Sequence, residues 1–405
     1  MAFLAVTALL AARTLRILNV PGDPAMDGTR WALCDFRDAV YYPAVSLLEG
    51  RNPYGESFSQ TYPVGSALAP YLPSMLLVNV PFGLMDLQVA EAVHFLLAVA
   101  LTLVLAGLGL ELAGLKRTSA RVFALGALLL SSRPGQWNLI LGQPTLQVAL
   151  GAYLALRWSD DRPWLAALAL SVAFGKPSFG LPLAVVMLAR GNARVALAGT
   201  AIAGGVSAAV VAVLVARSGF AAFLADVHAG FALWEAALDP FANSVAFYGS
   251  IDAGALFSRA LGREISLPEQ LVVTAVVLAI AALAIRRLGL RPEPDARVRS
   301  LSLAALAVVV SVHHQAYDWL LLAPTMIAAA TGPGRLEPRG HDRLRLVLLG
   351  LLSVPALNYL ASNTALTGLG ITGALEFVVC SANGVALAGA LGIASAAALA
   401  EPPPA

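Results

Sequence analysis

Long apolar stretches separated by short polar segments run through most of this 405-residue chain. A helix of about 20 residues crosses the ~30 Å hydrocarbon core of a bilayer. Five stretches reach or approach that length, namely residues 89–113, 195–216, 269–285, 343–362 and 371–399. The pattern predicts an all-α, polytopic membrane protein.

Shorter apolar runs are interrupted by Gly, Pro and polar residues, as expected of short or broken helices at membrane depth. These runs are 120–131, 143–156, 164–174, 181–189, 299–312 and 316–330. Residues 1–20 are interpreted as a first helix although Arg13 and Arg16 interrupt it. A cleaved signal peptide is less well supported, because no positive charge precedes the apolar stretch. We expect about 10 to 12 transmembrane helices in a single domain over residues 1–400, with 401–405 as a disordered tail.

Composition supports this class of protein. Hydrophobic residues make up 59% of the chain, charged residues 12%, and the mean hydropathy is +0.77. A soluble enzyme, a nucleic-acid-binding protein and a disordered scaffold are thereby excluded. The two cysteines, Cys34 and Cys380, lie far apart, so neither a disulfide framework nor a CxxC metal site is expected.

Basic residues orient the predicted helices, because cytoplasmic loops are enriched in Lys and Arg. Alternating crossings put five clusters on one side, taken as the inside: Lys116, Arg117 and Arg121; Arg157 and Arg162; Arg190 and Arg194; Arg286, Arg287, Arg291, Arg297 and Arg299; Arg335, Arg339, Arg343 and Arg345. The loops of the other side are 21–88, 132–142, 175–180, 217–268, 313–318 and 363–370. These loops contain nearly all the unusual polar motifs, which predicts a site on the extracytoplasmic face.

The first and longest of these loops, 21–88, is too apolar for a soluble domain. Within it, residues 38–50 place Val40, Tyr41, Ala44, Leu47 and Leu48 on one face and end at Gly50, which predicts an amphipathic interfacial helix. Residues 61–85 form a Pro-interrupted apolar stretch suited to a second interfacial or re-entrant element. The loop 217–268 is the second large extracytoplasmic loop.

Two acids, Asp35 and Asp38, are the carboxylates of the first loop closest to the membrane exit. A carboxylate at a membrane boundary can act as a general base for an alcohol nucleophile. The alternative is that each caps the helix that follows, an interpretation that suits Asp38 better than Asp35 because Asp35 lies three residues earlier.

An ordered set of motifs then extends along the chain: Asp35-Phe36, Tyr41-Tyr42-x-Ala44, Leu48-x-Gly50-x-Asn52-Pro53-Tyr54, Tyr62-Pro63, Pro81-Phe82, Asn138 with Gly142-Gln143, Lys176-Pro177 and Asn243-Ser244. As a set, covering about residues 30–330, they resemble glycosyltransferase family 87. This family comprises polytopic GT-C-type enzymes, among them the polyprenol-phosphate-mannose-dependent mannosyltransferases and related arabinosyltransferases.

The resemblance implies a metal-independent hexosyltransferase that needs no cofactor and works with inversion at the extracytoplasmic face of the plasma membrane. Its donor would be a polyprenyl-phosphate sugar in the lipid bilayer, carrying mannose, another hexose or arabinose. Its acceptor would be a glycolipid, a glycan or a protein, and no nucleic acid is implied. The family's presumed base carries over onto Asp35. In the family the acid often stands about three residues before the tyrosine pair, however, and here that position is Asp38, so both remain candidates with Asp35 preferred.

A lipid phosphate leaving group needs cationic or N–H donors as the glycosidic bond breaks. The candidates are Lys176, Arg133, His313 and His314. Each also has a structural interpretation: Lys176 as a snorkelling side chain, Arg133 as an interfacial anchor and the histidines as caps of the preceding helix. No third ligand lies at a metal-like spacing from the histidine pair.

The remaining polar and aromatic candidates would bind sugar or acceptor. They are Tyr41, Tyr42, Asn52, Tyr54, Gln136, Asn138, Gln143, Asn243 and Asp318. The amides are equally consistent with hydrogen bonds between helices, the tyrosines with an interfacial aromatic belt, and Asp318 with a partner of one of the cations. A secondary transporter or flippase is the alternative function. It is less well supported, because the polar motifs gather at one face and no inverted pair of broken helices is evident.

Overall fold

The computed structural model describes residues 1–18, 32–65, 69–237, 245, 249–289, 294–331 and 340–401. Within these ranges the chain is helical throughout its regular structure, and the one isolated β-bridge joins Ser250 to Gln315. Asn243, Ser244 and residues 402–405, for which predictions were made, lie outside the described ranges.

Five of the described helices are long and apolar enough to cross a membrane. They are α6 (Leu87–Leu112), α12 (Ala193–Ser218), α15 (Leu267–Gly289), α18 (Gly340–Leu357) and α20 (Gly373–Ala400). Each coincides with one of the five long apolar stretches. Leu271 and Val272 of α15 are largely exposed, as suits a lipid-facing surface. The prediction of an all-α, polytopic membrane protein is therefore confirmed.

The shorter apolar runs also form helices. They are α7 (Ser119–Ser131), α9 (Thr145–Trp158), α10 (Pro163–Ala173), α11 (Pro177–Ala189), α16 (Pro294–Ser311), the 3₁₀ helix η3 (Ala316–Leu322) and α17 (Ala323–Thr331). Of these, α9 and η3 are largely buried, while α7, α10 and α11 expose part of their apolar surface. Helix α9 contacts α10, α11, α16 and η3, which makes it the centre of the bundle. These helices are short because polar residues follow at each end, and those residues form the sites described below.

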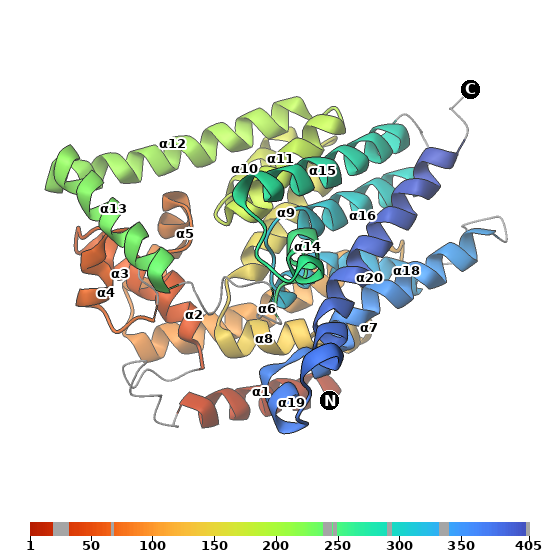
Figure 1. Ribbon diagram of the computed structural model, residues 1–405, viewed down its shortest axis with the longest axis horizontal. Helices are drawn as coiled ribbons and strands as arrows, with labels where there is room; N and C mark the ends of the chain where they lie inside the picture. The colour runs from red at the N-terminus through yellow and green to blue at the C-terminus, as the bar shows by residue number, and fades with distance from the viewer. Residues whose placement is uncertain are drawn as a thin grey trace.

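The first loop forms a compact group of short helices at one end of the molecule (Figure 1). They are α2 (Cys34–Phe36), the π-helix η2 (Arg37–Tyr41), α3 (Tyr42–Leu48), α4 (Glu56–Thr61) and α5 (Pro73–Gly83), and they follow α1 (Ala2–Leu18). The helical segment begins at Cys34 and not at Asp38, and Leu48 is 42% exposed instead of lying on the buried face. A π turn takes one residue more than an α turn, which shifts the side chains beyond it relative to the α-helical expectation.

Several helices lie in segments that were expected to be loops. They are α8 (Arg133–Leu141), α13 (Phe220–Ala237), α14 (Ala253–Leu261) and α19 (Asn363–Gly368), whereas the 3₁₀ helix η4 (Tyr359–Ala361) lies within the predicted span 343–362. Figure 1 shows α13 descending from the end of α12, and α13 packs against α4. Helix α8 begins with polar residues and has no strong hydrophobic periodicity, so the pattern along the chain did not reveal it. Helix α13 is mainly apolar and α14 is amphipathic, but both lie in the segment 217–268 that was assigned as a loop.

Candidate active site

The turn between α8 and α9 lies directly against α2. Gly142 ends α8 in the left-handed conformation, with φ of +74°. A Cβ at this position would lie 2.6 Å from Cβ of Phe36, so only glycine permits the close approach. The Leu33 N–H donates to the carbonyl of Ile140 at 2.7 Å and fixes the same contact. This packing places Gln143 beside Asp35.

The Gln143 side chain is held from both ends. Its Nε2 donates to Oδ2 of Asp35, and its Oε1 accepts from the Tyr71 hydroxyl at 3.0 Å. The Asn138 amide donates to the Gln143 carbonyl at 3.3 Å, and the Tyr54 hydroxyl donates to the Tyr71 carbonyl at 2.9 Å. Rotating the Gln143 amide would break two hydrogen bonds, so its donor end stays directed at the carboxylate.

Asp35 is a half-buried carboxylate with an unusual acidity. Burial raises the pKa of Asp35 from 3.8 to about 6, against the opposing effects of the Gln143 hydrogen bond, the Cys34 thiol at 3.7 Å and the Lys176 charge. A carboxyl group with a pKa near the working pH is well matched to proton transfer, because it accepts a proton readily yet is mostly ionised at neutrality.

Lys176 is oriented by a bidentate contact with Asp318. It stands at the N-cap of α11, where Pro177 begins the helix. Its Nζ lies 2.6 Å and 2.7 Å from the two carboxylate oxygens of Asp318. The same atom lies 5.3 Å from the ring centroid of Phe179 and 5.1 Å from that of Tyr317. The Lys176 side chain remains 16% exposed, whereas Asp318 is fully buried.

Asp318 accepts further hydrogen bonds from Thr145 Oγ1 at 3.1 Å and from the Gln315 N–H at 3.1 Å. Nδ1 of His314 lies 2.9 Å from its Oδ2. The other ring nitrogen of His314 donates to the Ser178 carbonyl at 3.1 Å, since a carbonyl oxygen only accepts. With both oxygens occupied and no exposed surface, Asp318 serves to hold Lys176 and does not face the space that Lys176 reaches.

The residues around Asp35 and the residues around Lys176 belong to one group, which we call the Asp35–Lys176 cluster. Its members are Asp35, Tyr71, Gln143, Thr145, Lys176, His314, Tyr317 and Asp318. Tyr71 connects the two parts of the cluster electrostatically. Burial first, and then the negative charges of both Asp35 and Asp318, raise the pKa of Tyr71 well above its usual value. Tyr71, Thr145 and Tyr317 were not predicted, although Tyr71 stands in the Pro-interrupted stretch of the first loop and Tyr317 in the His-His-Gln-Ala-Tyr-Asp motif.

Other predicted residues lie elsewhere. The Asp38 carboxylate accepts from the Gly65 N–H at 3.0 Å and lies within η2, so it is not an N-cap. Arg133 is buried, with its guanidinium on the Ala361 carbonyl and 5.1 Å from the Trp137 ring. This contact makes Arg133 a link between α8 and the segment that follows α18.

The predicted sugar-binding residues of the first loop make contacts within the protein. Tyr41 donates to the Met85 carbonyl at 3.0 Å and packs on Tyr42 with ring centroids 5.1 Å apart. The Asn52 amide donates to Asp226 of α13 at 2.8 Å. These contacts fix the loop against its neighbours.

Two further candidates lie outside the cluster: Gln136 contacts α1, and His313 stands at the edge of the cluster. Gln136 accepts from Arg13 at 3.0 Å, which joins α8 to α1. His313 precedes His314 but is exposed, with Nδ1 3.8 Å from Asp252. Of the predicted residues, the structure therefore gathers Asp35, Gln143, Lys176, His314 and Asp318 in one cluster.

For metal binding, the described part of the chain holds no group of three or more His, Cys, Asp or Glu side chains arranged as ligands. The cluster's own polar groups are a carboxylate with raised pKa, an oriented ammonium group and an oriented amide. These groups are suited to deprotonating a hydroxyl and to stabilising a developing anion.

Comparison with known proteins gave one finding. The model of a protein family described as Glycosyltransferase family 87 matches residues 70–312. This range includes Tyr71, Gln143 and Lys176, and it begins after Asp35 and ends just before His314. Neither the comparison with curated proteins nor that with solved structures found a match.

Proposed function

From the premise that this chain belongs to glycosyltransferase family 87 and is a membrane glycosyltransferase, we propose that it transfers a hexose from a polyprenyl-phosphate donor to an acceptor hydroxyl with inversion. Mannose is the preferred sugar, with another hexose or arabinose as the alternatives. The acceptor is a glycolipid, a glycan or a protein. Neither a metal nor a cofactor takes part in the proposed reaction.

In this reaction Asp35 is the general base. The acceptor oxygen forms a bond to the anomeric carbon, its proton passes to the Asp35 carboxylate, and the bond to the phosphate oxygen breaks. A carboxylate whose pKa is about 6 is ionised before the reaction and still basic enough to take the proton. The Gln143 amide fixes the direction of the carboxylate, which favours attack from a single position.

Lys176 stabilises the phosphate that leaves. The electron pair of the broken bond remains on the phosphate oxygen, and an ammonium group at hydrogen-bond distance offsets that charge. Asp318 occupies part of the donor capacity of Lys176 and fixes its direction. A lysine has three N–H donors, so a donor remains for a ligand. His313, exposed beside the cluster, is a second candidate contact for the phosphate.

The single observation that supports this proposal most strongly is the pattern of exposure in the Asp35–Lys176 cluster. Asp35 and Lys176 retain exposed surface, whereas His314 and Asp318, which hold Lys176, have none. A base and a cation thus reach the same region from a buried scaffold that keeps them in place. An ordinary structural ion pair such as Lys176–Asp318 has no need of a second, half-buried carboxylate with raised pKa beside it.

The proposed location is the extracytoplasmic face of the plasma membrane. Support comes from the basic residues Arg157, Arg190 and Arg297, which lie at the opposite ends of α9, α11 and α16 from the cluster. Because basic residues favour the cytoplasmic side, the cluster belongs to the other side. A polyprenyl tail would then lie in the bilayer with its phosphate at the outer surface.

The test is transfer by the full chain reconstituted in liposomes with radiolabelled polyprenyl-phosphate mannose and an acceptor membrane extract. We expect Asp35→Asn to lower transfer by about 10²-fold or more, as expected for loss of a general base. Asp38→Asn is the matched control, since its contact with the Gly65 N–H is preserved by an amide oxygen, and it keeps most of the rate. Equal rates for Asp35→Asn and the unmodified protein would contradict the assignment of the base.

A further inference from the structure

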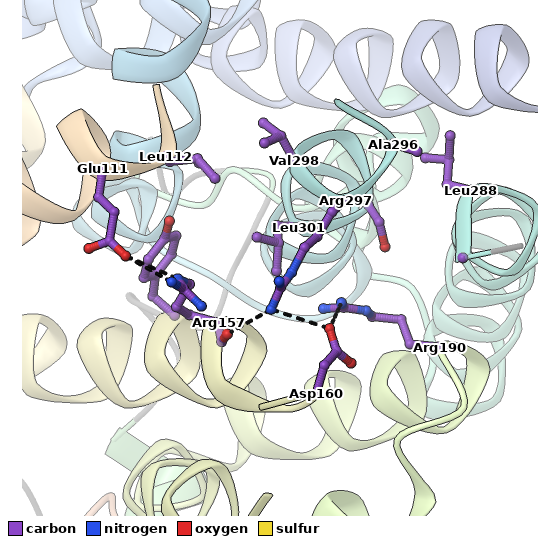
Figure 2. Close-up of a pocket in the computed structure, with 13 residues that line it drawn as sticks. Glu111, Leu112, Arg157, Asp160, Arg190, Leu288, Ala296, Arg297, Val298 and Leu301 are labelled. Carbon is purple, nitrogen blue, oxygen red and sulfur yellow. Dashed lines mark hydrogen bonds and ion pairs between the residues drawn. The ribbon is translucent and has the colours of Figure 1, made fainter. Parts of the chain in front are cut away.

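A second polar site lies at the far ends of the central helices. A cavity of about 550 Å³ opens where α6, α9, α11 and α15 end and α16 begins. Figure 2 shows Arg157, Arg190 and Arg297 around it, with Asp160 between Arg190 and Arg297 and with Glu111 on the outer side of Arg157. The volume is within the range of about 300–1,000 Å³ typical of small-molecule sites.

This cavity is separate from the Asp35–Lys176 cluster. Helix α9 begins at Thr145 in the cluster and reaches the cavity at Arg157, and α11 leads likewise from Lys176 to Arg190. At 1.5 Å per residue these helices put about 20 Å between the two sites. The cavity therefore lies on the side where the basic clusters gather.

Two guanidinium groups in the cavity bracket a single oxygen. Nη2 of Arg190 lies 3.5 Å from Oδ2 of Asp160, and Nη2 of Arg297 lies 3.4 Å from the same oxygen. Both arginines are also anchored by helix-end carbonyls, Arg190 on Leu156 at 3.4 Å and Arg297 on Arg157 at 3.3 Å. Their position is thus set by the backbone, and both can share an additional oxyanion.

Among the described residues, the ion-pair network around the cavity joins four arginines to three acids. Its members are Arg117, Arg157, Arg190 and Arg297 with Glu111, Asp160 and Asp161, and each acid is shared by two arginines. The Arg190 side chain is only 7% exposed. A guanidinium group that is held away from water, as that of Arg190 is, is stabilised by an anion next to it.

Hydroxyl groups complete the lining. The Ser300 hydroxyl is buried and has no hydrogen-bond partner within the described ranges. Tyr153 lines the same cavity with a second hydroxyl. Buried polar groups are almost always hydrogen-bonded, and an acceptor oxygen of a ligand in this cavity would satisfy the Ser300 hydroxyl.

We propose that this cavity binds a phosphate group through Arg190, Arg297 and Ser300. The phosphate belongs either to an anionic phospholipid headgroup of the inner leaflet or to a free phosphate ion. Arginine forks match phosphate oxygens closely, and basic pockets between transmembrane helices on the cytoplasmic side suit anionic headgroups. The inference does not depend on the proposed catalytic roles, because no residue is common to the two sites.

The test measures binding to the purified full chain in a neutral detergent by calorimetry. Sodium phosphate, compared with sodium chloride at equal ionic strength, probes the free ion. Dihexanoyl phosphatidylglycerol probes the headgroup, with dihexanoylglycerol as the analogue that lacks phosphate. We expect one phosphate-bearing probe to bind at one site per chain with a Kd of about 1 mM or lower. If only sodium phosphate binds, the ligand is the free ion. If only dihexanoyl phosphatidylglycerol binds, the ligand is the lipid headgroup.

Variants connect any binding to this cavity. Arg297→Gln removes a partly exposed arginine, and we expect it to weaken binding about tenfold or more through loss of one charged contact. Arg263→Gln is the matched control, because that arginine is also exposed and paired, with Glu269, but lies outside the cavity. Tyr153→Phe offers a milder change with the same expected direction. Absence of binding by both probes, or equal binding by Arg297→Gln and Arg263→Gln, overturns the proposal.

Discussion

Gln143, in the turn between α8 and α9, donates its side-chain amide to the carboxylate of Asp35 in α2, although the two residues are far apart in the sequence. The amide has no freedom to turn, because Tyr71 donates to its oxygen at 3.0 Å. The carboxylate is consequently fixed in direction while burial keeps its pKa near neutrality. These two properties, direction and acidity, lead to separate predictions.

The pH dependence of transfer follows from the acidity of Asp35. The base must be ionised, and its pKa is raised to about 6. We therefore expect kcat/KM to fall about tenfold per pH unit below that value and to level off above it. Rates measured from pH 4.5 to 8 with the reconstituted protein test this; a flat profile across that range would be inconsistent with a carboxyl base of this pKa.

Tyr71→Phe is expected to lower the rate of transfer and to move the fall of kcat/KM at acidic pH to a higher pH. Without the hydroxyl the Gln143 amide is free to rotate, and Asp35 loses a hydrogen bond that favours its ionised form. The matched control is Tyr41→Phe, whose hydroxyl contacts the Met85 carbonyl away from the cluster. If the pH profiles of both variants match that of the unmodified protein, Tyr71 has no role in positioning the Gln143 amide.

Gly142→Ala should abolish most transfer because the added Cβ would meet Phe36 at 2.6 Å and push the α8–α9 turn away from α2. Gly114→Ala is the matched control, which separates the clash of the added Cβ with Phe36 from the strain of a left-handed backbone. Gly114 has a similar φ, +69°, but nothing within 4 Å of its Cβ position. We expect a strained but active protein for Gly114→Ala. Similar losses in both variants would show that strain alone is responsible.

Asp318→Asn should lower the free energy of unfolding by about 3 kcal/mol, because it leaves the Lys176 ammonium and the buried His314 without their carboxylate. Adding Lys176→Met to it should restore part of the loss, since the uncompensated charge is gone. Thermal unfolding in detergent measures both variants. Asp161→Asn, which alters an exposed pair, is the control and should change little.

The hydrophobic pattern predicted the helices that cross the membrane, and all five long stretches are helices of suitable length. It succeeded there because some 20 consecutive apolar residues have few alternatives to a membrane-spanning helix. It failed for α8, which begins with polar residues, and for α13, which is mainly apolar but was assigned to the loop 217–268. Such helices form because of what they pack against.

Within the candidate site, the polar motifs near Asp35, Gly142-Gln143, Lys176 and His314 were recognisable along the chain. Their pairing was only partly predicted: Asp318 was grouped with the sugar-binding candidates, with a cation partner as the alternative, and the structure identifies that partner as Lys176. Tyr71 was overlooked because a tyrosine in an apolar, Pro-interrupted stretch is also what an interfacial aromatic belt contains.

The sequence by itself determined that this is a polytopic, all-α membrane protein and that it resembles glycosyltransferase family 87, because apolar run lengths and ordered motifs are properties of the chain alone. Only the tertiary structure decided that Asp35, and not Asp38, meets Gln143, and that Lys176 is held by Asp318. The two acids are three residues apart on a segment whose π turn changes the helical register. Which of them faces a neighbour depends on that turn and on the approach of Gly142 to Phe36, and neither is encoded in local spacing.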